Sequence, residues 1–167
     1  GLLITAGAFS KQFTDQLGES IPLETERGYH VHFKESARVV SRPVCSLDNG
    51  IYLTPMEQGL RAAGTVELGG LSNPPNPKRI QYVTLESKKM ISNLPDPYDS
   101  WMGFRPSLPD FVPVIGESKY YKNIFYAFGH HHLGWTLAAI TGSVISKIIC
   151  KDGVNLNFSK YSSDRFI

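Results

Sequence analysis

The spacing of hydrophobic residues along the chain predicts a mixture of strands and helices. Short apolar or alternating runs predict strands at Leu2–Ala6, Leu23–Phe33, Arg61–Leu68, Ser100–Pro106, Val112–Ile115 and Asn123–Phe128. Longer stretches predict helices at Phe9–Leu17, Lys78–Asn93 and Leu133–Cys150. These elements predict an α+β fold: a mostly antiparallel sheet with helices at its edges and one buried helix near the C-terminal end.

Turn residues and helical spacing sharpen this prediction in the middle of the chain. Asp48-Asn49-Gly50 and Met56–Gly59 each have the composition of a turn that joins two antiparallel strands. In the Lys78–Asn93 segment, apolar residues recur at helical spacing and predict one buried face, formed by Ile80, Val83, Met90 and Ile91.

The composition of the chain argues against several classes of protein. The 167 residues include 17 Lys plus Arg and 15 Asp plus Glu, so the formal net charge of +2 gives no reason to expect nucleic acid as a partner. The two cysteines, Cys45 and Cys150, lie far apart and indicate neither a zinc site nor a disulfide framework. A chain that begins directly on an apolar strand at Gly1-Leu2, without an initiator Met, is typical of a piece of a longer protein.

Candidate chemistry first appears at a glycine-flanked histidine run. Gly129-His130-His131-His132-Leu133-Gly134-Trp135-Thr136 lies between a predicted strand and the last predicted helix. Such a junction directs free backbone N–H groups toward a ligand. We do not expect a metal here, because consecutive turn residues point in different directions and no nearby Cys or Asp completes a ligand set. An ordinary polar turn is the alternative interpretation.

Arg105 is the second candidate. It ends an apolar strand that contains Trp101, within Gly103-Phe104-Arg105-Pro106. A guanidinium in apolar surroundings needs an anion, and the planar fork of arginine matches a substrate carboxylate. A structural salt bridge is the alternative. Tyr29 and Tyr52 are predicted to line a substrate pocket, although aromatic residues in strands more often pack in the core. His30 and His32 share one strand face by alternation.

Taken in order, several motifs resemble one family. They are TAGAFS at 5–10, IPLETERGYHV at 21–31, LRAAGTVELGG at 60–70, GFRPSLPDFVPVIG at 103–116 and FGHHHLGWTLAAITG at 128–142. They resemble the C-terminal half of the D-amino-acid oxidase/glycine oxidase superfamily of flavin enzymes, and within it the bacterial D-amino acid dehydrogenase small-subunit type. The chain departs from the family pattern at Phe111, where glycine is usual, and at His131-His132, where small residues are common.

The resemblance implies FAD as cofactor and a division of the chain into parts. Residues 1–22 would belong to the FAD-binding domain and 23–100 to the substrate-binding domain. Residues 101–150 would return to the interface of FAD and substrate, and 151–167 would form a surface tail. The family's GxGxxG motif, which is absent from this sequence, would lie in an N-terminal FAD-binding half upstream of Gly1, and this stretch alone would be inactive.

The resemblance also implies roles for individual residues. Arg105 would hold the carboxylate of an amino-acid substrate, with Tyr52 and Tyr29 lining the same pocket. The FAD would be contacted by residues from the two loops, namely Ala6, Gly7, Gly129, His130, Leu133, Gly134, Trp135 and Thr136. The reaction would pass a hydride from the substrate α-carbon to flavin N5, with no side chain acting as catalytic acid or base.

Alternatives remain open at this point. A glycine, sarcosine or (hydroxy)proline oxidoreductase would share the same arginine and helix start, and a non-catalytic carboxylate-binding module is a different class of protein. Either oxygen or a quinone would accept the electrons. The composition predicts a cytoplasmic protein, with peripheral docking on the inner face of the membrane as the alternative when the acceptor is a quinone or another membrane component.

Overall fold

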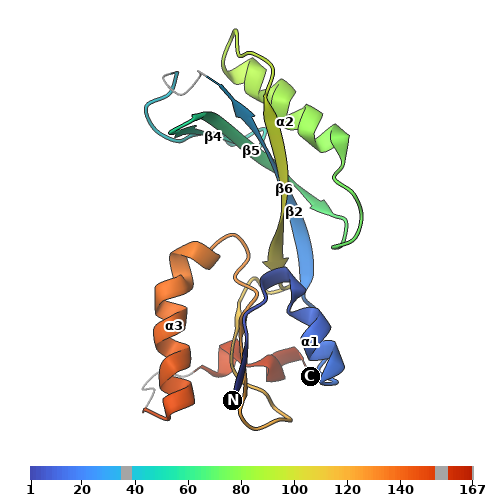
Figure 1. Cartoon of the computed structure of the whole chain (residues 1–167), viewed down its shortest axis with the longest axis vertical. Coiled ribbons are helices and arrows are strands. Elements are labelled where there is room, and N and C mark those ends of the chain that lie inside the picture. The colour runs from blue at the N-terminus through green and yellow to red at the C-terminus, as the bar shows by residue number, and fades with distance from the viewer. Residues whose placement is uncertain (35–38, 153–157, 167) are drawn as a thin grey trace. The chain divides into compact units, whose positions relative to one another are not determined.

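The computed structural model describes residues 1–34, 39–152 and 158–166 (Figure 1). The chain forms two compact units. The middle unit is Glu26–Phe104, and the terminal unit combines Gly1–Thr25 with Arg105–Ile167. Part of the predicted surface tail, residues 153–157 and 167, lies outside the described residues. The rest of that tail includes two short 3-10 helices, Ser159–Tyr161 and Ser163–Phe166.

The middle unit is built on a five-stranded sheet that confirms the predicted strands and turns. Its strands lie in the order β3–β4–β5–β2–β6, and the β3–β4, β4–β5 and β5–β2 pairs are antiparallel. Their bounds are β2 Glu24–Phe33, β3 Val44–Ser46, β4 Ile51–Met56, β5 Gly59–Leu68 and β6 Asp99–Ser107. The two predicted turns join β3 to β4 and β4 to β5.

Helix α2 (Pro77–Met90) covers one face of this sheet (Figure 1). Asn76 caps the helix by accepting a hydrogen bond from the Lys78 N–H at 3.0 Å, and Pro77 fits the first turn, where its missing N–H costs nothing. Alternation along the strands supplies the core beneath the helix, which includes Tyr29, Val31, Phe33, Ile51, Leu53, Leu60, Ala62 and Val83. Ile80, Met90 and Ile91 pack against this core, which confirms the predicted apolar face of the helix.

The terminal unit contains a three-stranded mixed sheet. Strand β1 (Leu2–Ile4) pairs in parallel with β8 (Ile124–Phe128), which pairs antiparallel with β7 (Val114–Glu117). A 3-10 turn, Gly7–Phe9, and the short helix α1 (Lys11–Gln16) follow β1. Together with the sheet of the middle unit, these elements confirm the α+β class.

Helix α3 (Gly134–Cys150) packs on β7 and β8 of this sheet. The long apolar helix is therefore confirmed, but it is buried along one face only, through Thr141, Val144 and Ile145. Other positions on the helix, among them Trp135 and Ile140, are exposed in this chain. No helix within the described ranges is both long and apolar enough to span a membrane.

A buried carboxylate ties the terminal unit together. Glu19 is fully buried, and it accepts hydrogen bonds from the hydroxyls of Ser118, Tyr126 at 2.9 Å and Ser163 at 3.4 Å. Burial raises the pKa of the Tyr126 hydroxyl above its usual value, so this group stays a hydrogen-bond donor. The network joins segments from both ends of the sequence, which local sequence patterns do not reveal.

Candidate functional site

The carboxyl ends of two parallel strands bring the predicted cofactor residues to one edge of the terminal unit. Strands β1 and β8 are in register, with Ile4 opposite Tyr126, so the chain leaves both strands at the same edge of the sheet. Ala6 and Gly7 follow β1 there, and Gly129 follows β8. Parallel strands with loops at their carboxyl ends are a common location for ligand sites.

Two glycines shape this edge. Gly7 has φ +55°, a conformation that side chains rarely adopt, and a Cβ added to it would meet no atom within 4 Å. The space beside Gly7 is therefore open. Gly129 differs, because a Cβ there would lie 2.5 Å from Leu108 Cδ1. Gly129 is thus required by packing within the protein as well as by its φ of +84°.

The N-terminus of α3 lies immediately after this loop. Its N-cap residue, Leu133, supplies no side-chain hydrogen bond to the N–H groups of the first turn, which belong to Gly134, Trp135 and Thr136. The side chain of Trp135 is 96% exposed. An uncapped helix N-terminus carries partial positive charge and stabilises an anion or a developing negative charge.

The three histidines of the loop have different surroundings. His130 is partly buried, and its Nε2 lies 3.0 Å from Thr141 Oγ1 on α3. Burial lowers the pKa of His130, so the ring is neutral at neutral pH. His131 packs edge-on against Phe111. Within residues 1–34, 39–152 and 158–166, no group of three His, Cys, Asp or Glu side chains is arranged to hold a metal ion.

Arg105 lies near the same loop. It precedes Pro106, whose carbonyl accepts a hydrogen bond from the backbone N–H of His131 at 2.9 Å. This bond fixes the end of β6 to the loop that follows β8. The Nη1 atom of Arg105 is buried and has no hydrogen-bond partner in the described part of the chain. A buried guanidinium nitrogen without a partner is costly, and an anionic ligand would remove that cost.

The two predicted tyrosines lie in different environments of the middle unit. Tyr52 is on β4, opposite Cys45 and Ala63, with its side chain on the sheet face away from α2 and largely exposed. Tyr29 is buried beneath α2. Its hydroxyl donates to Glu67 Oε2 and accepts from the Asn76 N–H at 3.0 Å. These contacts give Tyr29 a structural role, and substrate contact by either tyrosine stays a prediction.

Sequence analysis missed a buried arginine beside Tyr29. Arg27 is 1% exposed and donates to three backbone carbonyls: Gly70 at 2.7 Å, Asn73 at 2.8 Å and Pro74 at 3.2 Å. Its Nη1 also lies 3.8 Å from Glu67 Oε2. The guanidinium therefore holds the loop between β5 and α2 in place. Its partners are backbone atoms more than forty residues away in the sequence, so no local motif predicts that this arginine is buried and hydrogen-bonded.

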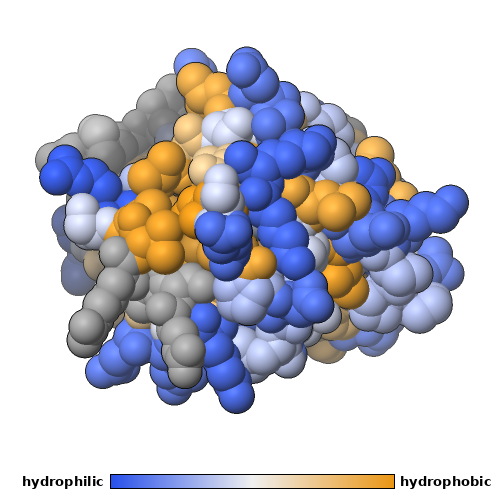
Figure 2. Space-filling view, turned by 90° about the horizontal axis from the view of Figure 1, so that it is seen from above, coloured by the Kyte–Doolittle hydropathy of each residue, from blue (hydrophilic) through white to orange (hydrophobic). Residues whose placement is uncertain are grey.

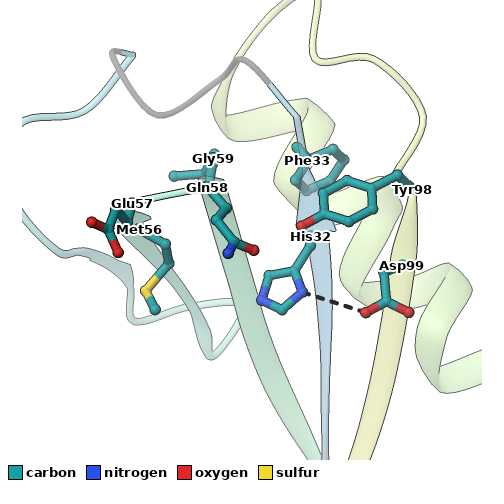
Figure 3. A pocket seen from close by; sticks show the side chains of 9 residues that line it. His32, Phe33, Met56, Glu57, Gln58, Gly59, Tyr98 and Asp99 are labelled. Carbon is teal, nitrogen blue, oxygen red and sulfur yellow. Dashed lines mark ion pairs between the residues drawn. The ribbon is translucent and has the colours of Figure 1, made fainter.

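A pocket of the middle unit opens beside β2, the β4–β5 turn and the start of β6 (Figure 3). It has a volume of about 450 Å³ and is lined by residues of β2, the β4–β5 turn and the start of β6. His32 and Asp99 form an ion pair at its edge, with Nδ1 and Oδ2 3.7 Å apart. None of its described lining residues is a predicted site residue.

Comparison with known proteins identifies a family and several relatives that this chain resembles. Residues 2–148 match the family model described as DAO, FAD dependent oxidoreductase. A D-amino-acid oxidase of Bradyrhizobium diazoefficiens is 36% identical, over 99% of this chain and 40% of its own length. A D-amino acid dehydrogenase of Vibrio vulnificus is 29% identical, over 96% of this chain and 40% of its length. This chain thus spans about 40% of these relatives.

Solved structures share the fold. Glycine oxidase from Geobacillus kaustophilus superposes with a TM-score of 0.86 at 21% identity, covering 99% of this chain and 45% of that protein. L-proline dehydrogenase from P. horikoshii gives 0.84 at 22% identity, covering 98% and 46%. Enzymes with different substrates therefore share this architecture, and the fold does not specify the substrate.

Proposed function

This chain belongs to the DAO family of FAD-dependent oxidoreductases, and from that premise we propose that it is part of an enzyme that oxidatively deaminates D-amino acids. Relatives that match it over nearly its whole length include a D-amino-acid oxidase and a D-amino acid dehydrogenase. We place FAD at the edge formed by the loops after β1 and β8, and the substrate carboxylate at Arg105.

The residues at this edge suit a flavin. The open space beside Gly7 leaves room for a ligand to approach the backbone, and the uncapped N–H groups of Gly134, Trp135 and Thr136 favour a group that becomes negative. When bound, FAD supplies the acceptor for the hydride of the substrate α-carbon. The helix N-terminus would stabilise the negative charge that reduction produces, because its partial positive charge is fixed in place before reaction.

The observation that carries the proposal for substrate binding is the unpartnered Nη1 of Arg105. A carboxylate would accept two parallel hydrogen bonds from this guanidinium. Such a pair fixes both the position and the orientation of the substrate, so the same α-hydrogen would face the acceptor in every turnover. His130 is held neutral by burial and adds no charge that would compete for the carboxylate.

The relatives differ in electron acceptor by name, one an oxidase and the other a dehydrogenase. We propose the dehydrogenase chemistry, with a quinone or another membrane component taking the electrons, and an N-terminal half that supplies the dinucleotide-binding GxGxxG loop. The proposed partner surface includes the unpaired edge of β1, where Leu2 and Leu3 are exposed among the described residues.

The test of this function is Arg105→Lys and Arg105→Ala in the complete FAD-loaded enzyme. Lysine keeps the charge but loses the two-pronged match, so kcat/KM for a D-amino acid should fall at least ~10-fold, and further for alanine. The flavin absorbance spectrum should stay that of the wild type, because this residue addresses the substrate.

An amine without a carboxylate is the control substrate, and its oxidation should hardly change in either variant. A wild-type kcat/KM for a D-amino acid in Arg105→Ala would show that the carboxylate is held elsewhere. An equal loss on all substrates, together with a lower unfolding midpoint, would assign Arg105 to a structural salt bridge.

A further inference from the structure

Arg165 lies in the short 3-10 helix Ser163–Phe166, within the segment that the sequence predicts as a surface tail. Hydrophilic residues, drawn in blue, cover much of the face seen in Figure 2, as is usual for a protein surface. Arg165 differs from such residues, because its side chain is only 16% exposed. A partly buried guanidinium with several acceptors fixes the segments that supply them.

The acceptors of Arg165 lie mostly in residues 108–112, between β6 and β7, which we call the β6–β7 turn. Its Nε donates to Asp110 Oδ2 at 2.7 Å, and its Nη2 donates to the Val112 carbonyl. Its Nη1 donates to the Ser162 carbonyl at 2.8 Å, which ties the guanidinium to its own segment. Asp110 also accepts a hydrogen bond from the Val112 N–H at 3.1 Å. Arg165 thus holds a turn that lies more than fifty residues earlier in the sequence.

The segment that carries Arg165 is anchored in the core of the terminal unit. Ser163 is 1% exposed, and its hydroxyl donates to the buried carboxylate of Glu19 at 3.4 Å. Phe166 packs against the core cluster of this unit, and the guanidinium carbon of Arg165 lies 4.3 Å from the centre of its ring. Because the base of Arg165 is fixed on both sides, its hydrogen bonds restrain the β6–β7 turn.

The β6–β7 turn contacts the loop that follows β8 at two points. Leu108 is buried, and a Cβ added to Gly129 would lie 2.5 Å from its Cδ1, so these two residues are closely packed. The ring of Phe111 meets the ring of His131 edge-on, with centroids 5.0 Å apart. The position of the loop therefore depends on the position of the turn.

The second contact joins two residues with an unusual backbone. Phe111 has φ +57° and His131 has φ +56°, in the left-handed region that bulky residues rarely adopt. Both are positions at which the sequence departs from the family pattern of glycine or small residues. Such conformations persist only where the surroundings hold them. Arg165 binds the residues on both sides of Phe111, namely Asp110 and Val112.

We infer that Arg165 is a positioning residue for the loop that follows β8. Its bonds to Asp110 and Val112 fix the β6–β7 turn, and the contacts of the turn with Gly129 and His131 fix the loop. The inference rests on the proposed function, which places FAD at this loop. It adds a residue outside the site that keeps the loop in the shape that binds the cofactor.

The experiment measures the dissociation constant of FAD in the complete enzyme, from the fluorescence of free flavin, at a temperature where every variant is folded. Arg165→Ala should raise this constant ~3-fold or more, because the turn loses its restraint. Phe111→Gly should raise it as well, and glycine adopts this φ without strain, so the variant folds. The double variant should show no larger rise than the greater single one, since both changes act through the same contacts.

Two control variants separate the positioning role from charge and from stability. Lys160→Ala removes an exposed cation from the same segment and should leave the FAD constant unchanged. Tyr126→Phe removes a hydroxyl that donates to Glu19, so it should lower the unfolding midpoint without changing the FAD constant.

A wild-type FAD constant in Arg165→Ala, or an equal rise in Tyr126→Phe, would overturn the inference and assign Arg165 to stability alone. Additive effects of Arg165→Ala and Phe111→Gly would overturn it too. If the enzyme oxidises no D-amino acid but Arg165→Ala still weakens FAD binding selectively, the proposed function fails and the positioning role stands. If D-amino acids are oxidised and the FAD constant does not change, the proposed function stands and the positioning role fails.

Discussion

Two arginines on neighbouring strands of this protein have opposite surroundings. Arg27 on β2 is fully buried, donates to three backbone carbonyls, lies near Glu67 and places its guanidinium 5.7 Å from the ring centre of Phe104. Arg105 on β6 is half-buried, and its Nη1 has no partner among the described residues. Arg27 follows Glu24-Thr25-Glu26 and Arg105 follows the apolar Trp101–Phe104. Arg27 finds its hydrogen-bond partners within the protein, whereas Arg105 retains a donor without a partner among the described residues.

The difference separates a residue that holds the fold from one that is ready for a ligand. A guanidinium has five N–H donors, and a folded protein satisfies those that it buries. Where the protein itself supplies the acceptors, as at Arg27, removing the side chain leaves carbonyls without partners. At Arg105 the described residues supply no acceptor for Nη1. The desolvation cost of burying this nitrogen is therefore offset only when an anion binds.

The largest expected effect is on Arg27. Arg27→Met should lower the free energy of unfolding by about 3–5 kcal/mol, because methionine leaves three backbone carbonyls without their hydrogen-bond donor and the Glu67 carboxylate without its neighbouring cation. Urea unfolding followed by circular dichroism measures this loss. A loss below ~1 kcal/mol would mean that the loop after β5 does not depend on this guanidinium.

Tyr29→Phe tests the structural role of a second residue of β2, whose hydroxyl contacts the same carboxylate, Glu67, as Arg27. It removes the hydrogen bond to Glu67 and the acceptor of the Asn76 N–H, so unfolding should cost about 2 kcal/mol less than in the wild type. If Tyr29 acts only in the fold, kcat/KM of the complete enzyme should hardly change at a temperature where the variant is folded. A selective rise in KM would instead support the predicted substrate contact.

Arg105→Met is the matched counterpart of Arg27→Met. The same substitution should change the free energy of unfolding by less than about 1 kcal/mol, and an increase is expected, since a buried nitrogen without a partner is removed. The measurement is the same urea titration in the absence of any carboxylate ligand. A loss as large as that at Arg27 would place a structural partner at Arg105 and remove the basis for its role in binding.

The last prediction concerns the pH dependence of stability at His30, whose pKa is lowered to about 4 chiefly by burial. The unfolded state, with an ordinary pKa near 6.5, binds the proton more readily, so stability should decrease as pH falls from about 6.5 toward 4 and stay constant above that range. His30→Asn should show a flatter dependence over this interval when urea midpoints are compared at pH 7.5 and 5. An unchanged slope would place the responsible group elsewhere.

The sequence determined the elements of this protein because their signals are local. Glycine and Asn-Gly turns, strand alternation and the helical spacing of Ile80 and Val83 predicted the hairpins and the face of α2, and the motifs at 103–116 and 128–142 indicated the family. Arg105 was predicted as a candidate for the same reason, since a cation at the end of an apolar strand is visible without coordinates.

The tertiary structure decided which polar side chains are satisfied, because their partners are distant in sequence. Arg27 and Tyr29 look alike in a strand pattern, yet only folding brings Gly70, Asn73 and Asn76 to them. Likewise, the sequence pattern predicts that Trp101 is an ordinary aromatic residue of a strand. Its position against Gly103 and His30 is visible only in the tertiary structure. Hydrogen bonding and packing depend on the final positions of atoms, and local periodicity carries no information about partners forty residues away.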